Sequence, residues 1–158
     1  MEPITFNTKP AFTVVGVKIR HNGNDPSDVS KKQIPGLWHT FIPRMDEIKH
    51  KATPPTSYGL MDNFDRTAGE FDYTAAFEVT STDDIPDGMF HKSVPEGYYA
   101  VFTSTLGTLG PSFHAIYKQW LPNADYVRAE GPEFELYPPD FAGRDDSPVY
   151  IYIPVQKK

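Results

Sequence analysis

Two glutamates and a tyrosine recur at every second position in the short stretch from Gly131 to Tyr137 (GPEFELY). The Gly-Pro pair at its start and Pro138-Pro139 after it predict a β-strand bounded by turns. Successive side chains of a strand point to opposite faces, so Glu133, Glu135 and Tyr137 share one face. On a solvated face they would be ordinary surface residues. On a covered face a carboxylate is costly without a partner, and that partner could be a cationic ligand.

The overall composition favours a globular chain that does not bind nucleic acid. The 158 residues are 39% hydrophobic and 14% aromatic, with a formal charge of −6. This length is within the usual range of one domain and allows a sizeable core. Basic residues form only the isolated pairs Lys31-Lys32 and Lys157-Lys158, so nucleic acid is a poor partner. The negative charge mildly favours cations.

Several kinds of site are disfavoured by the residue types present. Cysteine is absent, which excludes disulfides, thiol nucleophiles and thiolate metal ligands. The five histidines show no metal-ligand spacing. Gly107 and Gly110 flank an expected helix start without a phosphate-loop lysine. We therefore expect no metal site and no cofactor.

The chain shows no targeting or membrane-spanning segment. Its amino terminus lacks the basic and apolar regions of a signal peptide. No apolar stretch approaches the ~20 residues needed to cross a bilayer. We expect a cytoplasmic protein that does not contact membranes.

Hydrophobic periodicity predicts a mixture of strands and two main helices. An apolar stripe at helical spacing begins at Ile34 and includes Trp38, with Pro35 in the first turn and an end near Phe41. A second helix is expected from Leu109 to Trp120. Residues 21–30 read as a polar loop, and residues 80–96 as a linker. The expected strands are 12–20, 58–64, 71–79, 97–104, 133–137 and 149–155.

The order strand, helix, strand, strand occurs twice, in halves of roughly 10–80 and 95–157. Trp38 corresponds to Phe113 at an offset of 75 residues (113 − 38), and the same offset sets Leu60 against Glu135. We therefore expect one domain over residues 1–158 with an α+β fold. Its duplicated β-α-β-β units would form one antiparallel sheet with both helices on one side. A central groove near the pseudo-twofold axis would favour a ligand.

An ordered set of motifs resembles the GyrI-like effector-binding domains of AraC-type and MerR-type multidrug regulators, which also occur as free-standing proteins. The set comprises the doubled order, Trp38, the strand entry VPEGYYAVF, the helix end Trp120-Leu121-Pro122 and the strand FELY. It covers the chain from about Phe12 to Val155. The resemblance implies SHS2-type repeats. No room for a helix-turn-helix module precedes Phe12, so we expect no direct DNA binding.

The resemblance implies a site for hydrophobic, possibly cationic, drug-like compounds. The buried glutamate of the matching family strand contacts the ligand, which assigns that role to Glu135 with Tyr137 as its neighbour. Aromatic walls are expected from Trp38, Tyr58, Tyr98 and Phe77. A single cation–π contact contributes about 0.5 to 2 kcal/mol, so several give useful but promiscuous affinity. Glu78 and Glu133 are expected to be solvated.

Two other functions remain open. Some free-standing members with a tryptophan on the first helix resemble hydrolases of reactive cyclopropane-containing quinone compounds. In such an enzyme Glu135 would be the catalytic acid or base, because desolvation raises a carboxyl pKa toward neutrality. The family name also suggests a protein-interaction role in gyrase inhibition, with an unknown protein partner.

Overall fold

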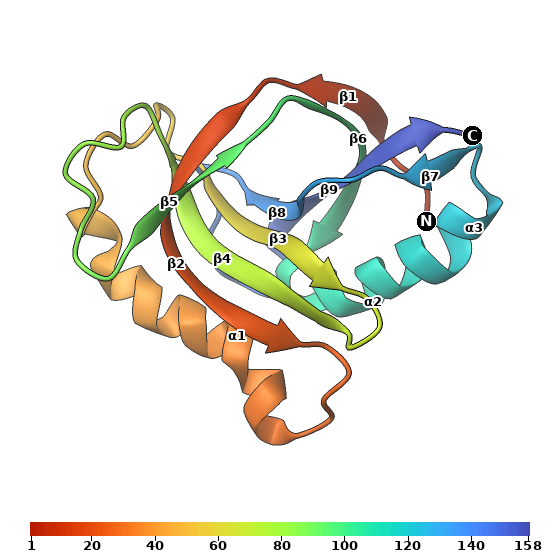
Figure 1. Ribbon diagram of the computed structural model, residues 1–158, viewed down its shortest axis with the longest axis horizontal. Coiled ribbons are helices and arrows are strands. Elements are labelled where there is room, and N and C mark those ends of the chain that lie inside the picture. The colour runs from red at the N-terminus through yellow and green to blue at the C-terminus, as the bar shows by residue number, and fades with distance from the viewer.

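The computed structural model describes residues 1–158, and its nine strands form one antiparallel sheet (Figure 1). Two main helices complete the predicted α+β fold. The strands are β1 (Thr5–Lys9), β2 (Phe12–Asn22), β3 (Ser57–Asp65), β4 (Glu70–Val79), β5 (Phe90–Val94), β6 (Gly97–Thr105), β7 (Tyr126–Arg128), β8 (Glu133–Tyr137) and β9 (Pro148–Lys157). The helical segments are α1 (Asp28–Phe41), η1 (Ile42–Glu47), η2 (Leu106–Thr108), α2 (Leu109–Ala115), η3 (Ile116–Trp120) and α3 (Leu121–Asn123).

The strand order β1-β6-β9-β8-β3-β4-β2-β5 has matching halves on either side of the central β3–β8 pair. Going outward, β4 corresponds to β9, and β2 corresponds to β6. The outermost strands are exchanged: β1 leads into β2 but pairs with β6, whereas β5 leads into β6 but pairs with β2. Only residues 10–11 separate β1 from β2, so the curved sheet brings its two edges together there (Figure 1).

The offset between the halves is 76 residues in the strands and not 75, because the pair Tyr58–Ala76 of the first half corresponds to the pair Phe134–Tyr152 of the second (134 − 58 and 152 − 76). Gly59, not Leu60, lies opposite Glu135 in the central pair, and Leu60 lies opposite Phe134. A one-residue slip moves a strand side chain to the other face of the sheet. Leu60 and Glu135 therefore point to opposite sides, and the 75-residue offset does not hold in these strands.

The first helix begins earlier than its apolar stripe indicates. The Ser27 hydroxyl accepts a hydrogen bond from the Ser30 amide and caps α1, so part of the predicted polar loop is helical. Pro35 lies inside α1 and not in its first turn. The helix ends at Phe41 as predicted, and Pro43 falls in the 3₁₀ turn η1. The second helix runs through α2, a π-helical turn η3 and the short α3.

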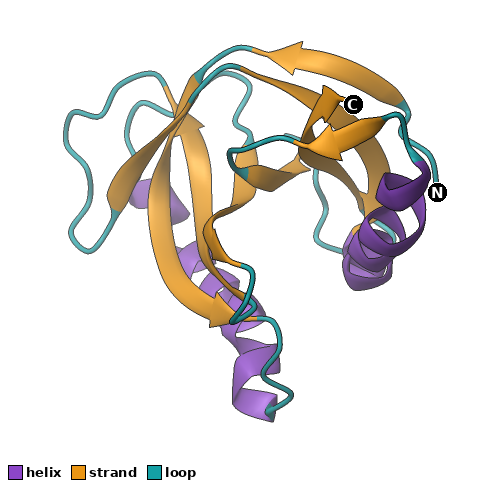
Figure 2. Cartoon of the chain, turned by 45° about the vertical axis from the view of Figure 1, so that its right-hand side comes forward, coloured by secondary structure: helices purple, strands orange, loops and turns teal.

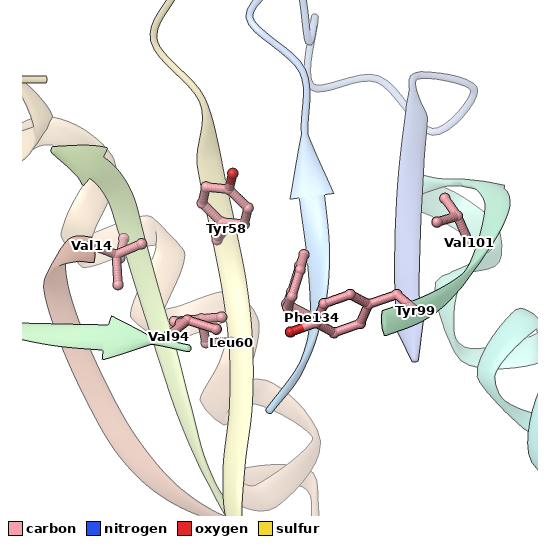
Figure 3. Packing of buried hydrophobic residues seen from close by; sticks show 8 residues of the cluster. Val14, Tyr58, Leu60, Val94, Tyr99, Val101 and Phe134 are labelled. Carbon is pink, nitrogen blue, oxygen red and sulfur yellow. The ribbon is translucent and has the colours of Figure 1, made fainter. Parts of the chain in front are cut away.

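Both helices lie on the same side of the sheet, with a separation between them over its centre (Figure 2). Beneath α1 is one buried cluster that includes Phe41, Met61 and Tyr73, and beneath α2 another that includes Phe102 and Trp120. A third cluster fills the opposite, inner side of the sheet (Figure 3) and contains Val14, Tyr58, Leu60, Ala76, Val94, Tyr99, Val101 and Phe134. The central strands are thus covered on both faces, which allows polar groups to be buried there.

Three short strands were absent from the sequence prediction. Strand β5 lies within the predicted linker, and β1 and β7 are five and three residues long. Each is held by pairing with a longer strand distant in sequence. Their own patterns are too short and too polar to indicate a strand without that partner.

Candidate functional site

A cavity of about 440 Å³ lies between the two helices, over the central strands β3, β4 and β8. Its lining is largely apolar and aromatic, with carboxylates at its base. The lining residues that enter the argument are Ile34 from α1, Phe113 and Tyr117 from the second helical segment, Met61, Phe64, Phe71 and Tyr73 from β3 and β4, and Glu133 and Glu135 from β8.

Glu135 is the central acidic group of this cavity and is only 7% exposed. Tyr73 and Tyr137 both donate hydrogen bonds to its Oε1, at 2.7 and 2.8 Å. Its Oε2 accepts no hydrogen bond from a protein group. Because no fully buried side-chain oxygen lacks a partner, Oε2 is not completely enclosed, and Glu135 is one of the residues that line the cavity. The carboxylate is therefore held through one oxygen, while the other has no protein partner.

Burial controls the protonation of Glu135. Desolvation raises its pKa from the ordinary 4.5 to about 7, and the nearby Glu133 charge acts in the same direction. The hydrogen bonds from Tyr73 and Tyr137 oppose this rise because they favour the ionised form. Conversely, burial and the Glu135 charge raise the pKa of both tyrosine hydroxyls, which keeps them as donors.

Gly59 provides the space for this hydrogen-bonded group. It lies directly opposite Glu135 in the sheet. A β-carbon at this position would overlap both the Tyr73 hydroxyl and Glu135 Oε1. Only glycine therefore allows the tyrosine and the glutamate to meet above the central strand pair.

Trp38 contacts both tyrosines that bond Glu135. Its Nε1–H donates to the Tyr73 hydroxyl at 2.8 Å, and its ring packs edge-on against Tyr137 with centroids 5.2 Å apart. It does not line the cavity. Trp38 was expected to form an aromatic wall of the site. In the structure it instead contacts the two tyrosines that bond Glu135.

A second carboxylate, Glu133, lines the same cavity and is 3% exposed, so the expectation that it is solvated is wrong. Its Oε1 accepts hydrogen bonds from Tyr117 and from the guanidinium of Arg128. The sequence placed Glu133 on the correct face. It could not show that the second helix and β7 cover this end of the strand.

The remaining predicted wall residues lie elsewhere. Tyr58 is on the inner face of β3, where its hydroxyl donates to Glu78 at 2.8 Å (Figure 3). Tyr98 is 41% exposed and stacks near Phe6. Phe77 shares the Glu135 side of the sheet but packs toward Phe41 beyond the cavity. None of these three aromatic residues lines the cavity.

The cavity is instead lined by aromatic residues that the sequence analysis did not assign to a site. Phe113 and Tyr117 are four residues apart and so share a helix face, a spacing that could have indicated a common wall. Phe71 and Tyr73 share a strand face in the same way. No sequence signal showed that these pairs converge, because their elements meet only through tertiary packing.

The structure contains no group of three or more histidine, cysteine, aspartate or glutamate residues placed to hold a metal ion. None of its helices combines the length and apolar character needed to cross a bilayer.

Comparison with known sequences places this geometry among effector-binding proteins. Residues 5–155 match the family model Cass2, described as an integron-associated effector binding protein. The transcriptional regulator BrlR of Pseudomonas aeruginosa is 40% identical over 151 residues, covering 93% of this chain and 53% of BrlR. A DNA gyrase inhibitor of Erwinia billingiae is 35% identical over 66 residues, covering 40% of this chain and 43% of the inhibitor. The chain thus spans about half the length of the curated relatives it matches.

Two solved structures share the fold over nearly the whole chain. The integron cassette protein VCH_CASS2 of Vibrio cholerae superposes with a TM-score of 0.68 and 22% identity, covering 98% of this chain and 96% of that one. The protein SAV2435, solved bound to tetraphenylphosphonium, gives a TM-score of 0.71 and 20% identity, covering 99% and 94%.

Proposed function

The chain belongs to the family of integron-associated effector binding proteins, and we propose that it binds hydrophobic, positively charged small molecules in the cavity beside Glu135. The observation that carries this proposal is the buried Glu135 carboxylate, which lines an otherwise largely apolar cavity and whose Oε2 has no protein partner. A buried carboxylate without a cationic side-chain partner gains from a ligand that supplies the positive charge.

The cavity walls suit an aromatic or otherwise flat apolar cation. Phe64, Phe71, Phe113 and Tyr117 provide aromatic surface around the acid. Each cation–π contact is expected to contribute about 0.5 to 2 kcal/mol, in addition to the attraction of Glu135. Because these interactions require charge and shape but few directed hydrogen bonds, the site should accept several related compounds.

The tetraphenylphosphonium complex of SAV2435 supports this ligand class. That protein shares the fold of this chain, and its bound ligand is a lipophilic monocation. Because the similar protein BrlR is a transcriptional regulator, we propose that residues 1–158 form one domain that binds an effector and either reports it to a partner or sequesters it.

Tetraphenylphosphonium and tetraphenylborate provide a direct test, because they have similar shape and opposite charge. Calorimetric titration at pH 8 is expected to show binding of the phosphonium and none of the borate. Glu135→Gln should weaken phosphonium binding by at least about tenfold, since it removes the charge while keeping the side-chain shape. The matched control Glu96→Gln changes an exposed acid outside the cavity and should bind as the unmodified protein does.

Equal binding of both ions, or phosphonium binding that survives Glu135→Gln unchanged, would overturn the proposal. The first result would mean that shape alone drives association. The second would mean that the ligand binds away from Glu135.

A second candidate function is supported by the protonation of Glu135. A carboxyl with a pKa of about 7 is suited to general acid–base catalysis at neutral pH. Glu135 would then protonate an electrophile, such as a cyclopropane-containing quinone, or activate a water molecule for its hydrolysis. Product formation that is lost in Glu135→Gln would support this function, and unchanged substrate after prolonged incubation with the protein would exclude it for that compound.

A further inference from the structure

The charge of Glu133 is already matched inside the protein, although Glu133 lines the same cavity as Glu135. Arg128 Nη2 and Nε lie 3.1 and 3.2 Å from Glu133 Oε1, and Tyr117 donates to the same oxygen. The two glutamates are two positions apart on β8, so their α-carbons are about 7 Å apart. The cavity base thus contains two carboxylates, only one of which has a cationic side-chain partner.

Arg128 is fixed in this position by several contacts. Its Nη1 donates to the carbonyl of Ala129 at 2.8 Å, and its Nη2 donates to the carbonyl of Gly131 at 3.0 Å. The guanidinium also lies 4.9 Å from the centre of the Phe64 ring, a cation–π contact with the cavity wall. The side chain is 13% exposed. These contacts fix the guanidinium beside Glu133.

The other charged residues that line the cavity lie nearer to solvent. Asp65 and Arg66 are exposed and carry opposite charges. Glu70 is partly buried and lies 3.7 Å from Arg20. Exposed charges are screened by water and salt, whereas buried charges are screened much less. The unbalanced charge that a bound ligand meets is therefore the single carboxylate of Glu135.

We propose that Arg128 is a specificity-determining residue: by neutralising Glu133 it leaves one unbalanced negative charge in the cavity, which favours singly charged cations over doubly charged ones. This inference rests on the proposed cation-binding function. A second positive charge on a ligand would enter beside an acid that Arg128 already occupies. It would lose hydration without gaining a free counter-charge.

Ethidium and propidium allow this inference to be tested, because they share one ring system and carry one and two positive charges. The affinity of each dye is measured by fluorescence titration for four forms of the protein. The summed charge of residues 128, 133 and 135 is −1 in the unmodified protein, −2 in Arg128→Met and zero in Glu133→Gln. In the double variant, which combines Arg128→Met with Glu133→Gln, this charge is again −1, from Glu135. The ratio of propidium to ethidium affinity should increase as this summed charge becomes more negative. It should rise by at least about tenfold in Arg128→Met, fall in Glu133→Gln and return to the starting value in the double variant.

Arg144→Met is the matched control. It removes the same charge from an exposed arginine whose partner Asp146 is also exposed, and the affinity ratio should not change. Arg128→Met leaves Glu133 buried without its cation and lowers stability. If that variant does not fold, the comparison of Glu133→Gln with the double variant still tests the inference.

The affinity ratio separates this inference from the proposed function. If ethidium binding is insensitive to Glu135→Gln, the cation-binding function itself is refuted. If ethidium binding requires Glu135 but the ratio is the same in all four forms, Arg128 does not set the charge preference and only this inference fails.

Discussion

Glu135 should lower the stability of the folded protein at alkaline pH, and Glu135→Gln should remove this effect. Its pKa is about 7 in the folded chain and has the ordinary value of 4.5 when the site is absent. Between these two values the folded chain binds more protons than the unfolded chain, so stability is lost as pH rises from 4.5 through 7. Above pH 8 the carboxylate must be buried in its charged form.

The size of the effect follows from the two pKa values. A difference of about 2.5 pKa units corresponds to about 3 kcal/mol of stability lost above pH 8, and to less than about 1 kcal/mol at pH 5. The glutamine introduced by Glu135→Gln would keep an oxygen for the two tyrosine donors and turn its amide nitrogen toward the cavity. For a chain of this length the gain corresponds to a melting temperature raised by about 6 to 12 °C.

Urea denaturation at pH 5 and pH 8.5, followed by tryptophan fluorescence, measures this difference. We expect Glu135→Gln to be more stable than the unmodified protein at pH 8.5 and close to it at pH 5. Glu96→Gln, which alters an exposed acid, should show no such pH-dependent gain. A Glu135→Gln protein that gains nothing at pH 8.5, or gains equally at both pH values, would refute the assignment of a raised pKa.

Four further outcomes follow from the same contacts. Tetraphenylphosphonium affinity should fall by about tenfold per pH unit below pH 7, because protons compete for Glu135, and titrations from pH 5.5 to 8.5 should show no such slope in Glu135→Gln. Tyr73→Phe or Tyr137→Phe removes a hydrogen bond that favours the ionised acid, so the midpoint of this pH dependence should move upward; an unchanged midpoint would contradict the role of the hydroxyls. Gly59→Ala should abolish phosphonium binding in calorimetry, and full binding by this variant would show that the close packing above Gly59 is not required. Trp38→Phe removes one donor to the Tyr73 hydroxyl and should cost about 1 kcal/mol of stability in urea denaturation.

Local patterns in the sequence were sufficient for the principal elements of the fold. Alternation in GPEFELY placed Glu133, Glu135 and Tyr137 on one face, and the structure has them there. The repeated strand, helix, strand, strand order predicted the matched halves around the central strand pair. These inferences succeeded because side-chain direction within an element depends only on neighbouring residues.

The exchanged edge strands and the exact register required the folded chain. Strand β5 lies in a segment that reads as a linker and becomes a strand only by pairing with β2. The correspondence between the halves is shifted by one residue in the strands, and Gly59 is the residue that pairs with Glu135. Sequence spacing in the helices could not determine the register of strands that meet through long-range pairing.

For the chemistry of the site, too, the sequence determined one part and the tertiary structure another. The sequence alone predicted an acidic strand face that includes Glu135, and the family resemblance proposed Glu135 as the ligand-contacting acid. Only the tertiary structure decided that this face is covered, that Tyr73 and Tyr137 hold one oxygen of Glu135, and that Arg128 neutralises Glu133. The physical reason is that burial and charge pairing depend on which distant elements pack together, and the charge left unbalanced in the cavity is the result of that packing.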